Sequence, residues 1–222
     1  MDLRGNAVTW LGHGTWLWET SEGKRVLVDP WLDGNPSCPD HLKDPSPLDA
    51  VLVSHGHFDH TGDAVSIIKT SGAPAVAIFE VGQALIDEGC ENVVQMNKGG
   101  TVEVAGIKAT MVDARHSGHQ AGFVIEFPDG LVVYQAGDTD VFGDMALIAE
   151  IYRPHVSVLP IGDHFTMGPR QAAHAVRLLG ATQVICGHFG TFPPLVGRPA
   201  HLRELVGPGV DIPDLEPGTR FG

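Results

Sequence analysis

The chain has 222 residues, of which 43% are hydrophobic and 18% are charged, with 28 Gly and 16 Pro, a composition that is typical of a loop-rich globular domain rather than a disordered or fibrous chain. Its formal charge is −13, from 14 Lys and Arg against 27 Asp and Glu, which disfavours nucleic acid as the main partner. The 3 Cys form no C-x-x-C pair, and no export signal or membrane-spanning apolar run is apparent, so we expect a cytoplasmic protein.

Three short strands, at 7–11, 15–19 and 25–28, are predicted at the start of the chain and form a β-meander. The sequence Gly12-His13-Gly14 interrupts the first two strands. His13 is compatible either with a turn residue or with a side chain that approaches a functional site. Asp29-Pro30 ends the third strand, and a Pro-rich irregular loop follows at 33–47.

The most informative segment follows the apolar strand 51–53 and contains three His and one Asp within six residues, His55-Gly56-His57-Phe58-Asp59-His60. In an extended segment, residues two apart point to the same side, so His55 and His57 can bind one ion. Asp59 and His60 come where the chain must turn, and they suit a neighbouring ion. Imidazole and carboxylate groups are ligands for zinc, manganese and iron. The segment therefore predicts a metal site.

The remaining pattern alternates between helices and strands and then returns to strands before alternating again. We predict helices at 62–70, 81–88, 144–152, 169–179 and near 200–206. The strands expected in the same region are 75–78, 93–95, 101–104, 107–113, 122–127, 131–135, 156–159 and 182–186. The Pro- and Gly-rich tail, 207–222, is expected to run over the surface.

Three further candidate ligands each follow the end of a predicted strand: His116, Asp138 and His188. Strand ends of this kind meet at one edge of an open α/β sheet, which is where such sheets bind ligands. His119 competes with His116 for the same position, and similarity to a known family, in whose members a His directly followed by Ser or Gly occurs there, favours His116.

The order of these residues resembles the metallo-β-lactamase superfamily, whose signature is H-x-H-x-D-H after a hydrophobic strand. The segments 136–139, 142–148, 159–169 and 187–193 look like the small metal-dependent hydrolase branch, related to ascorbate-6-phosphate lactonase. This resemblance implies an α+β fold, a four-layer αβ/βα sandwich of two mixed β-sheets flanked by helices. It also implies that residues 1–222 form a single domain.

The resemblance further implies a site for two divalent metal ions. His55, His57 and His116 would bind the first ion, Asp59, His60 and His188 the second, and Asp138 would bridge them. Asp29 would orient the metal-binding loop through a hydrogen bond. Two departures from the branch are Gln135, where His is usual, and His164, where Asn is usual.

By the same resemblance, we expect a hydrolase in which a hydroxide shared by two ions, Zn²⁺ or else Mn²⁺ or Fe, attacks a small lactone, ester or phosphoester. Asp59 and Asp138 would act at the metals, while His164 and His13 would stabilise charge or protonate the leaving group. A phosphodiesterase or nuclease of the same fold and a non-catalytic metal-dependent binding module are the alternatives. The expected partner is a small molecule rather than a nucleic acid or a membrane, and self-association into a homo-oligomer is compatible with the sequence.

Overall fold

The computed structural model describes all 222 residues, and its strands form two β-sheets. The first sheet has seven strands in the order β13-β1-β2-β3-β4-β5-β6. Neighbouring strands are antiparallel from β13 to β3 and parallel from β3 to β6. The strands are β1 Ala7–Trp10, β2 Trp16–Glu19, β3 Arg25–Val28, β4 Ala50–Val53, β5 Ala75–Ile78, β6 Val93–Met96 and β13 Arg220–Phe221.

The second sheet has six strands in the order β12-β11-β10-β9-β8-β7. It is antiparallel from β7 to β10 and parallel from β10 to β12, so both sheets are mixed. The strands are β7 Thr101–Val104, β8 Ile107–Val112, β9 Gly122–Glu126, β10 Val132–Gln135, β11 Val156–Pro160 and β12 Val184–Gly187.

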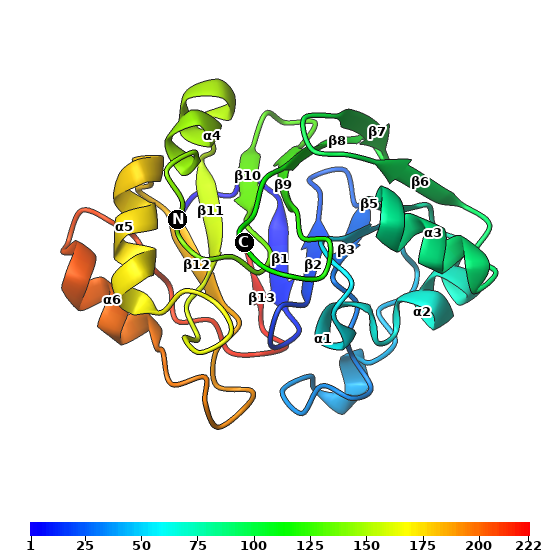
Figure 1. Cartoon of the computed structure of the whole chain (residues 1–222), viewed down its shortest axis with the longest axis horizontal. Coiled ribbons are helices and arrows are strands. Elements are labelled where there is room, and N and C mark those ends of the chain that lie inside the picture. The colour runs from blue at the N-terminus through cyan, green and yellow to red at the C-terminus, as the bar shows by residue number, and fades with distance from the viewer.

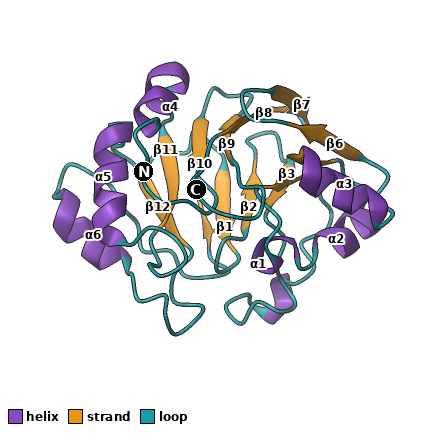
Figure 2. Ribbon diagram, viewed as in Figure 1, coloured by secondary structure: helices purple, strands orange, loops and turns teal.

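Helices cover the outer faces of both sheets, with α2 and α3 on one flank and α4, α5 and α6 on the other (Figures 1 and 2). The molecule is therefore the four-layer sandwich of two mixed sheets that the family resemblance implied. The helices are α1 Phe58–Thr61, α2 Ala64–Ser71, α3 Phe79–Asp87, α4 Met145–Tyr152, α5 Pro169–Leu179 and α6 Pro199–Val206, with a short 3₁₀ helix at Asp40–Leu42. No helix is both long enough and apolar enough to cross a membrane.

Two apolar clusters hold the layers together. The larger contains 41 buried residues, including Trp18 of the first sheet and Phe123 of the second, and it extends under α2 and α3. The smaller contains 19 residues, among them Tyr134 and Val176, and it joins the second sheet to α4, α5 and α6. Complete burial of a Val, Leu, Ile, Phe or Met side chain stabilises a fold by about 1.5–3 kcal/mol. The apolar strands therefore lie in the centre.

Helix α5 shows how local sequence sets an element's limits. Pro169 occupies the first turn, where the missing N–H is not needed, and Gly180 ends the helix with a left-handed φ of 57°. Between them, Ala172, Val176 and Leu179 lie buried on one face at helical spacing.

Three details differ from the sequence-based prediction. The turn of the metal-binding motif is a short helix, α1, and helix α3 begins at Phe79 rather than at residue 81. The tail runs over the surface as expected, but no strand was predicted in it, and β13 pairs with β1 through Val8 and Phe221. The reason is that β1 would otherwise be an edge strand with unpaired backbone groups, which the tail satisfies.

The loops that follow several strands are tied together at one edge of the two sheets. The Gly56 N–H donates to the Gly118 carbonyl (2.8 Å), and the Ala121 N–H donates to the Ser54 carbonyl (2.9 Å). The His188 N–H donates to the carbonyl of His13 (2.9 Å). These bonds cross between the sheets, so they fix the loops that carry the candidate ligands relative to one another.

Candidate metal centre

Three histidines converge at the end of β4 and the loop after β8. His57 Nδ1 lies 3.1 Å from His55 Nε2 and 3.2 Å from His116 Nε2. One ligand nitrogen from each of the three rings lies within 4.8 Å of the other two, and the three residues form one of the groupings that could hold an ion. The structure therefore brings together the three residues expected to bind the first metal.

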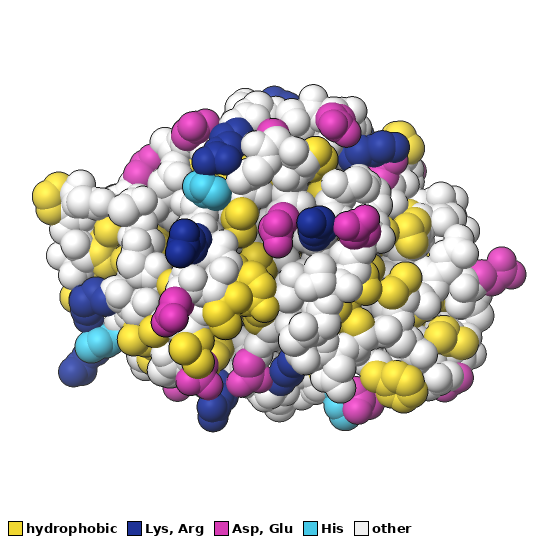
Figure 3. Space-filling view, turned by 90° about the horizontal axis from the view of Figure 1, so that it is seen from above, with side chains coloured by type: hydrophobic (Ala, Val, Ile, Leu, Met, Phe, Trp, Pro, Cys, Tyr) yellow, Lys and Arg dark blue, Asp and Glu magenta, His cyan; other side chains and the backbone are white.

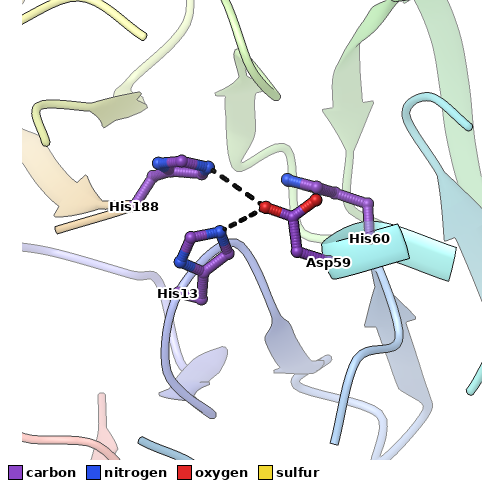
Figure 4. A group of neighbouring side chains, drawn as sticks. All are labelled: His13, Asp59, His60 and His188. Atoms are coloured by element: carbon purple, nitrogen blue, oxygen red, sulfur yellow. Dashed lines mark hydrogen bonds and ion pairs between the residues drawn. The ribbon is translucent and has the colours of Figure 1, made fainter. Parts of the chain in front are cut away.

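A second group combines Asp59 and His60 of α1 with His188, which follows β12, and with His13 from the loop between β1 and β2 (Figure 4). Their ligand atoms also lie within 4.8 Å of one another. In Figure 4 the rings of His13 and His188 both face the carboxylate of Asp59. This group contains the three residues expected at the second metal, with one addition, His13.

Asp138 lies between the two groups. Its Oδ2 atom is 2.9 Å from His188 Nε2 and 3.3 Å from His60 Nε2. The same oxygen is 3.6 Å from His116 Nε2 and 3.9 Å from His55 Nε2. One buried carboxylate oxygen therefore faces imidazole nitrogens from both groups, which is the position a bridging ligand requires.

The unpaired imidazole nitrogens suit a metal ion. His60 Nε2 and His188 Nε2 are buried and make no hydrogen bond of normal geometry, although Asp138 lies close to both. A buried polar atom that finds no protein partner is costly, and a cation satisfies a nitrogen lone pair. The donor set of imidazoles and carboxylates thus fits a divalent transition metal.

Burial keeps several of these rings neutral, which is the form that binds metals. It lowers the pKa of His55 to about 2, with a smaller contribution from the neighbouring His60. It also lowers the pKa of His116. Since imidazole must be unprotonated to bind a cation, both side chains are prepared for ligation at neutral pH.

His60 and Asp138 behave as an ion pair. Burial alone would lower the pKa of His60, but the carboxylates of Asp138 and Asp29 raise it well above its usual value. Burial alone would raise the pKa of Asp138, but His188 and His60 hold it well below its usual value. A divalent cation bound beside Asp138 would displace the proton of this pair, so metal binding is coupled to proton release.

Asp29 determines which ring nitrogen of His55, in the first group, and of His60, in the second group, is available to bind a metal ion. It is fully buried, with a left-handed φ of 52°, and it accepts hydrogen bonds from the Ser54 N–H (2.7 Å), the Ser54 hydroxyl (2.7 Å) and His60 Nδ1 (2.9 Å). Because the Ser54 hydroxyl donates to Asp29, its oxygen accepts from His55 Nδ1 at 3.0 Å. Both His55 and His60 are then left with Nε2 facing the metal site.

Two glycines allow the close approach of the loops. A Cβ atom at Gly14 would lie 2.5 Å from His60 Cε1. A Cβ atom at Gly118, where φ is 77°, would lie 2.9 Å from His57 Nε2. Any larger residue at either position would displace a ligand ring.

His13 lies in the second group and contacts two of its members, Asp59 and His188. We expected it to act on the substrate, but its ring is fully buried, and its Nε2 donates to Asp59 Oδ2 at 2.9 Å. Burial lowers the pKa of His13 to about 4 despite the hydrogen bond to Asp59, so the ring is neutral. Its carbonyl also accepts the His188 N–H at 2.9 Å. His13 thus positions Asp59 with its side chain and His188 with its backbone.

Replacing His13 with Ala is expected to lower zinc affinity at the second group by about 10- to 100-fold, since partners that orient ligands usually contribute this much. The first group should be unaffected. Competition with a chromogenic chelator measures both affinities. H119A is the matched control, because His119 is exposed and outside the cluster. Equal zinc binding by H13A and H119A would contradict the positioning role.

The structure distinguishes between the two candidates for the third histidine. His116 joins His55 and His57, whereas the ring of His119 is 61% exposed and lies 3.9 Å from Glu80. His164 is also exposed, its ring packs against Phe165 with centroids 4.5 Å apart, and it belongs to none of the ligand groupings. Its proposed role as a proton donor stays a prediction.

Gln135 and Ser54 are further buried polar residues near the cluster. Gln135 borders a small internal cavity together with Asp29 and His60, and its Oε1 has no hydrogen-bond partner. Sequence reasoning missed Ser54, although its position directly between strand β4 and His55 is a signal that could have found it. It also missed the aromatic residues around the site, because aromatic side chains on loops carry no spacing pattern.

Comparisons with known proteins identify relatives of the whole chain. Residues 24–189 match the family model of the beta-lactamase superfamily domain. The chain is 46% identical to a UPF0173 metal-dependent hydrolase from Koribacter versatilis, with 100% of both chains covered. Among solved structures, Igni18, a metallo hydrolase from Ignicoccus hospitalis, is 33% identical with a TM-score of 0.88, and 98% of each chain is covered. A metallo-beta-lactamase superfamily protein from Thermotoga maritima is 25% identical with a TM-score of 0.59, over 90% of this chain and 85% of that chain.

Proposed function

Because this chain belongs to the UPF0173 family of metal-dependent hydrolases, within the metallo-β-lactamase superfamily, we propose that it hydrolyses a small lactone, ester or phosphoester with two divalent metal ions. The observation that carries the two-ion proposal is the position of Asp138, whose Oδ2 faces imidazole nitrogens of both ligand groups. A lactone is included because of the resemblance to ascorbate-6-phosphate lactonase.

We assign the ligands as two sets that share one carboxylate. His55, His57 and His116 would hold the first ion, and Asp138 would contact both ions. Asp59, His60 and His188 would hold the second ion. We propose zinc as the metal, and manganese or iron would suit the same donors.

Two bound ions would supply a hydroxide at neutral pH, because they lower the pKa of a bound water toward about 7, and they would polarise the scissile bond. The chain's own residues hold these groups in place. Asp59 and Asp138 offset the positive charge, and the hydrogen bonds from His13 and to Asp29 fix the ligand orientation. This arrangement needs no Ser or Cys nucleophile.

Nuclease activity is less well supported than hydrolysis of a small molecule. On the face shown in Figure 3, Lys and Arg side chains are dispersed among Asp and Glu rather than gathered into a basic patch. The formal charge of −13 would also repel a polyanion.

The test is to count bound metal and to measure turnover in the same preparation. Protein purified without chelator is expected to contain about two ions per chain, and H55A and H188A should each retain about one. Wild type should hydrolyse members of a panel of lactones, esters and phosphoesters, lose activity with EDTA and regain it with zinc. H201A, which changes an exposed histidine on α6, is the control.

Two outcomes would contradict the proposal. A single ion bound to the wild type would rule out the two-metal mechanism. Two ions without turnover of any panel member would favour a non-catalytic metal-dependent binding module.

A further inference from the structure

We propose that the substrate is an uncharged carboxylic ester or lactone whose apolar group binds between Phe58, Phe165 and Phe192. This inference rests on the proposed hydrolase function and deepens it by choosing among its substrate classes. It is drawn from the shape, composition and charge of the cleft that leads to the metal centre.

The cleft has a volume of about 630 Å³, which is within the usual range for small-molecule sites. Its floor includes His57, His116 and Asp138, so a molecule in the cleft contacts the metal centre directly. Its walls are mainly apolar and include the rings of Phe58, Phe165 and Phe192 and the adjacent Pro193 and Pro194. A ligand therefore meets metal ligands at one end and apolar surface along its length.

Two of these rings are unusually exposed. Phe58 is 66% exposed and Phe165 is 52% exposed, and they come from different parts of the chain, α1 and the loop before α5. Neither ring contributes to the buried core, where a Phe normally lies. Aromatic side chains that converge on a cleft from separate segments of the chain, and that remain in water, are typical of a surface that a ligand covers.

Trp31 holds two of the rings in place. It is only 5% exposed and packs edge-on against Phe58 with centroids 5.8 Å apart. It also stacks against Phe192, with centroids 5.7 Å apart. The apolar walls are therefore supported from behind and are formed before a ligand binds, which reduces the entropy lost on binding.

The cleft offers no cationic side chain to an anionic substrate, because none of the residues that line it is Lys or Arg. Arg115 and Arg198, which are near some of these residues in sequence, are engaged elsewhere. Arg115 lies 3.6 Å from Asp113 and over the ring of Phe142, and Arg198 donates to the carbonyls of Leu195 and Gly197.

The lining residues with formal charge are Asp59 and Asp138, which belong to the proposed ligand sets, so bound ions would offset their charge. An anionic group on the part of the substrate that lies along the walls would find no Arg or Lys partner there. The same walls suit a neutral molecule with an aromatic or branched aliphatic group. The walls thus favour an uncharged ester over a substrate that carries an anionic group away from the metal centre.

The reaction is hydrolysis, and water is the only reactant besides the ester or lactone. The oxygen of water forms a bond to the acyl carbon, and the bond from that carbon to the alcohol oxygen breaks. One proton of the water goes to the departing alcohol oxygen and the other to solvent, which leaves a carboxylate and an alcohol. In a lactone, both products remain in one molecule.

The experiment compares two esters that differ in charge but share a leaving group, 4-nitrophenyl butyrate and mono-4-nitrophenyl succinate, with bis(4-nitrophenyl) phosphate as the phosphodiester. Zinc-loaded wild type is expected to have at least about tenfold higher kcat/KM for the butyrate than for the succinate. F58A and F165A should each raise KM for the butyrate about tenfold or more with little change in kcat, because they remove binding that is equal in the ground and transition states.

F79A is the matched control, since Phe79 is 53% exposed but does not line the cleft. Effects of F58A and F165A no larger than that of F79A would overturn the proposal, and so would a preference for the succinate. Metal-dependent turnover of the phosphodiester alone would overturn this inference and leave the hydrolase function standing. No metal-dependent turnover of any of the three would overturn both.

Discussion

Asp138→Asn protein is expected to lose turnover almost completely and to bind metal far more weakly than wild type. The change keeps the shape of the side chain but removes the charge from the one oxygen that faces His55, His60, His116 and His188. An amide cannot offset the charge of two cations, and it leaves His60 without one of its two carboxylate partners. Both ligand groups are affected because Asp138 contacts each of them.

The loss of zinc affinity should exceed the 10- to 100-fold effect that is typical of residues behind the ligands, and kcat/KM should fall by on the order of a thousandfold or more. Elemental analysis and turnover of the best ester measure the two effects. D140N is the control, because Asp140 lies two residues away, is exposed and makes no contact with the cluster. Retention of two ions by D138N would show that Asp138 does not bridge them.

Asp29→Ala protein is expected to be less stable and to bind both metals more weakly, although Asp29 is not itself a ligand. The change removes the acceptor for three buried donors, the Ser54 N–H, the Ser54 hydroxyl and His60 Nδ1. Leaving such groups unsatisfied should lower the free energy of unfolding by about 3 kcal/mol or more. Urea unfolding of the metal-free protein measures this loss.

The same change frees the tautomers of two ligands. Without Asp29, the ring proton of His60 can move to Nε2. The Ser54 hydroxyl can also turn and donate to His55 Nδ1, so that the ring proton of His55 moves to Nε2 as well. Zinc affinity should therefore fall about 10- to 100-fold at each group. D49A is a matched control, because Asp49 also accepts a backbone N–H, from Arg25, but belongs to the opposite end of the same strands. Wild-type zinc affinity in D29A would contradict this account.

The sequence predicted most of the architecture because local patterns fix local structure. Apolar runs such as 51–53 are buried strands, and Pro169 and Gly180 set the limits of a helix. The short strand β13 in the tail was the main exception. The partner of β13 is β1, more than 200 residues away in sequence, and a two-residue strand has no pattern of its own.

The candidate ligands could be found in the sequence because each follows a strand, and the ends of strands meet at one edge of each sheet. The spacing of His55 and His57 placed both on one side of the chain. The position of His116 relative to His119 depended on the loop conformation, in which Gly118 adopts a left-handed φ and brings the segment against His57.

By itself, the sequence determined the chemistry of this protein, since the residue types and their spacing indicate a metal centre with imidazole and carboxylate ligands. Only the tertiary structure decided how these groups are held and what they face. The contact of His13 with Asp59 and the convergence of Phe58, Phe165 and Phe192 on one cleft join segments that lie far apart in the chain. Such contacts follow from the packing of the two sheets and their loops, and no local periodicity encodes them.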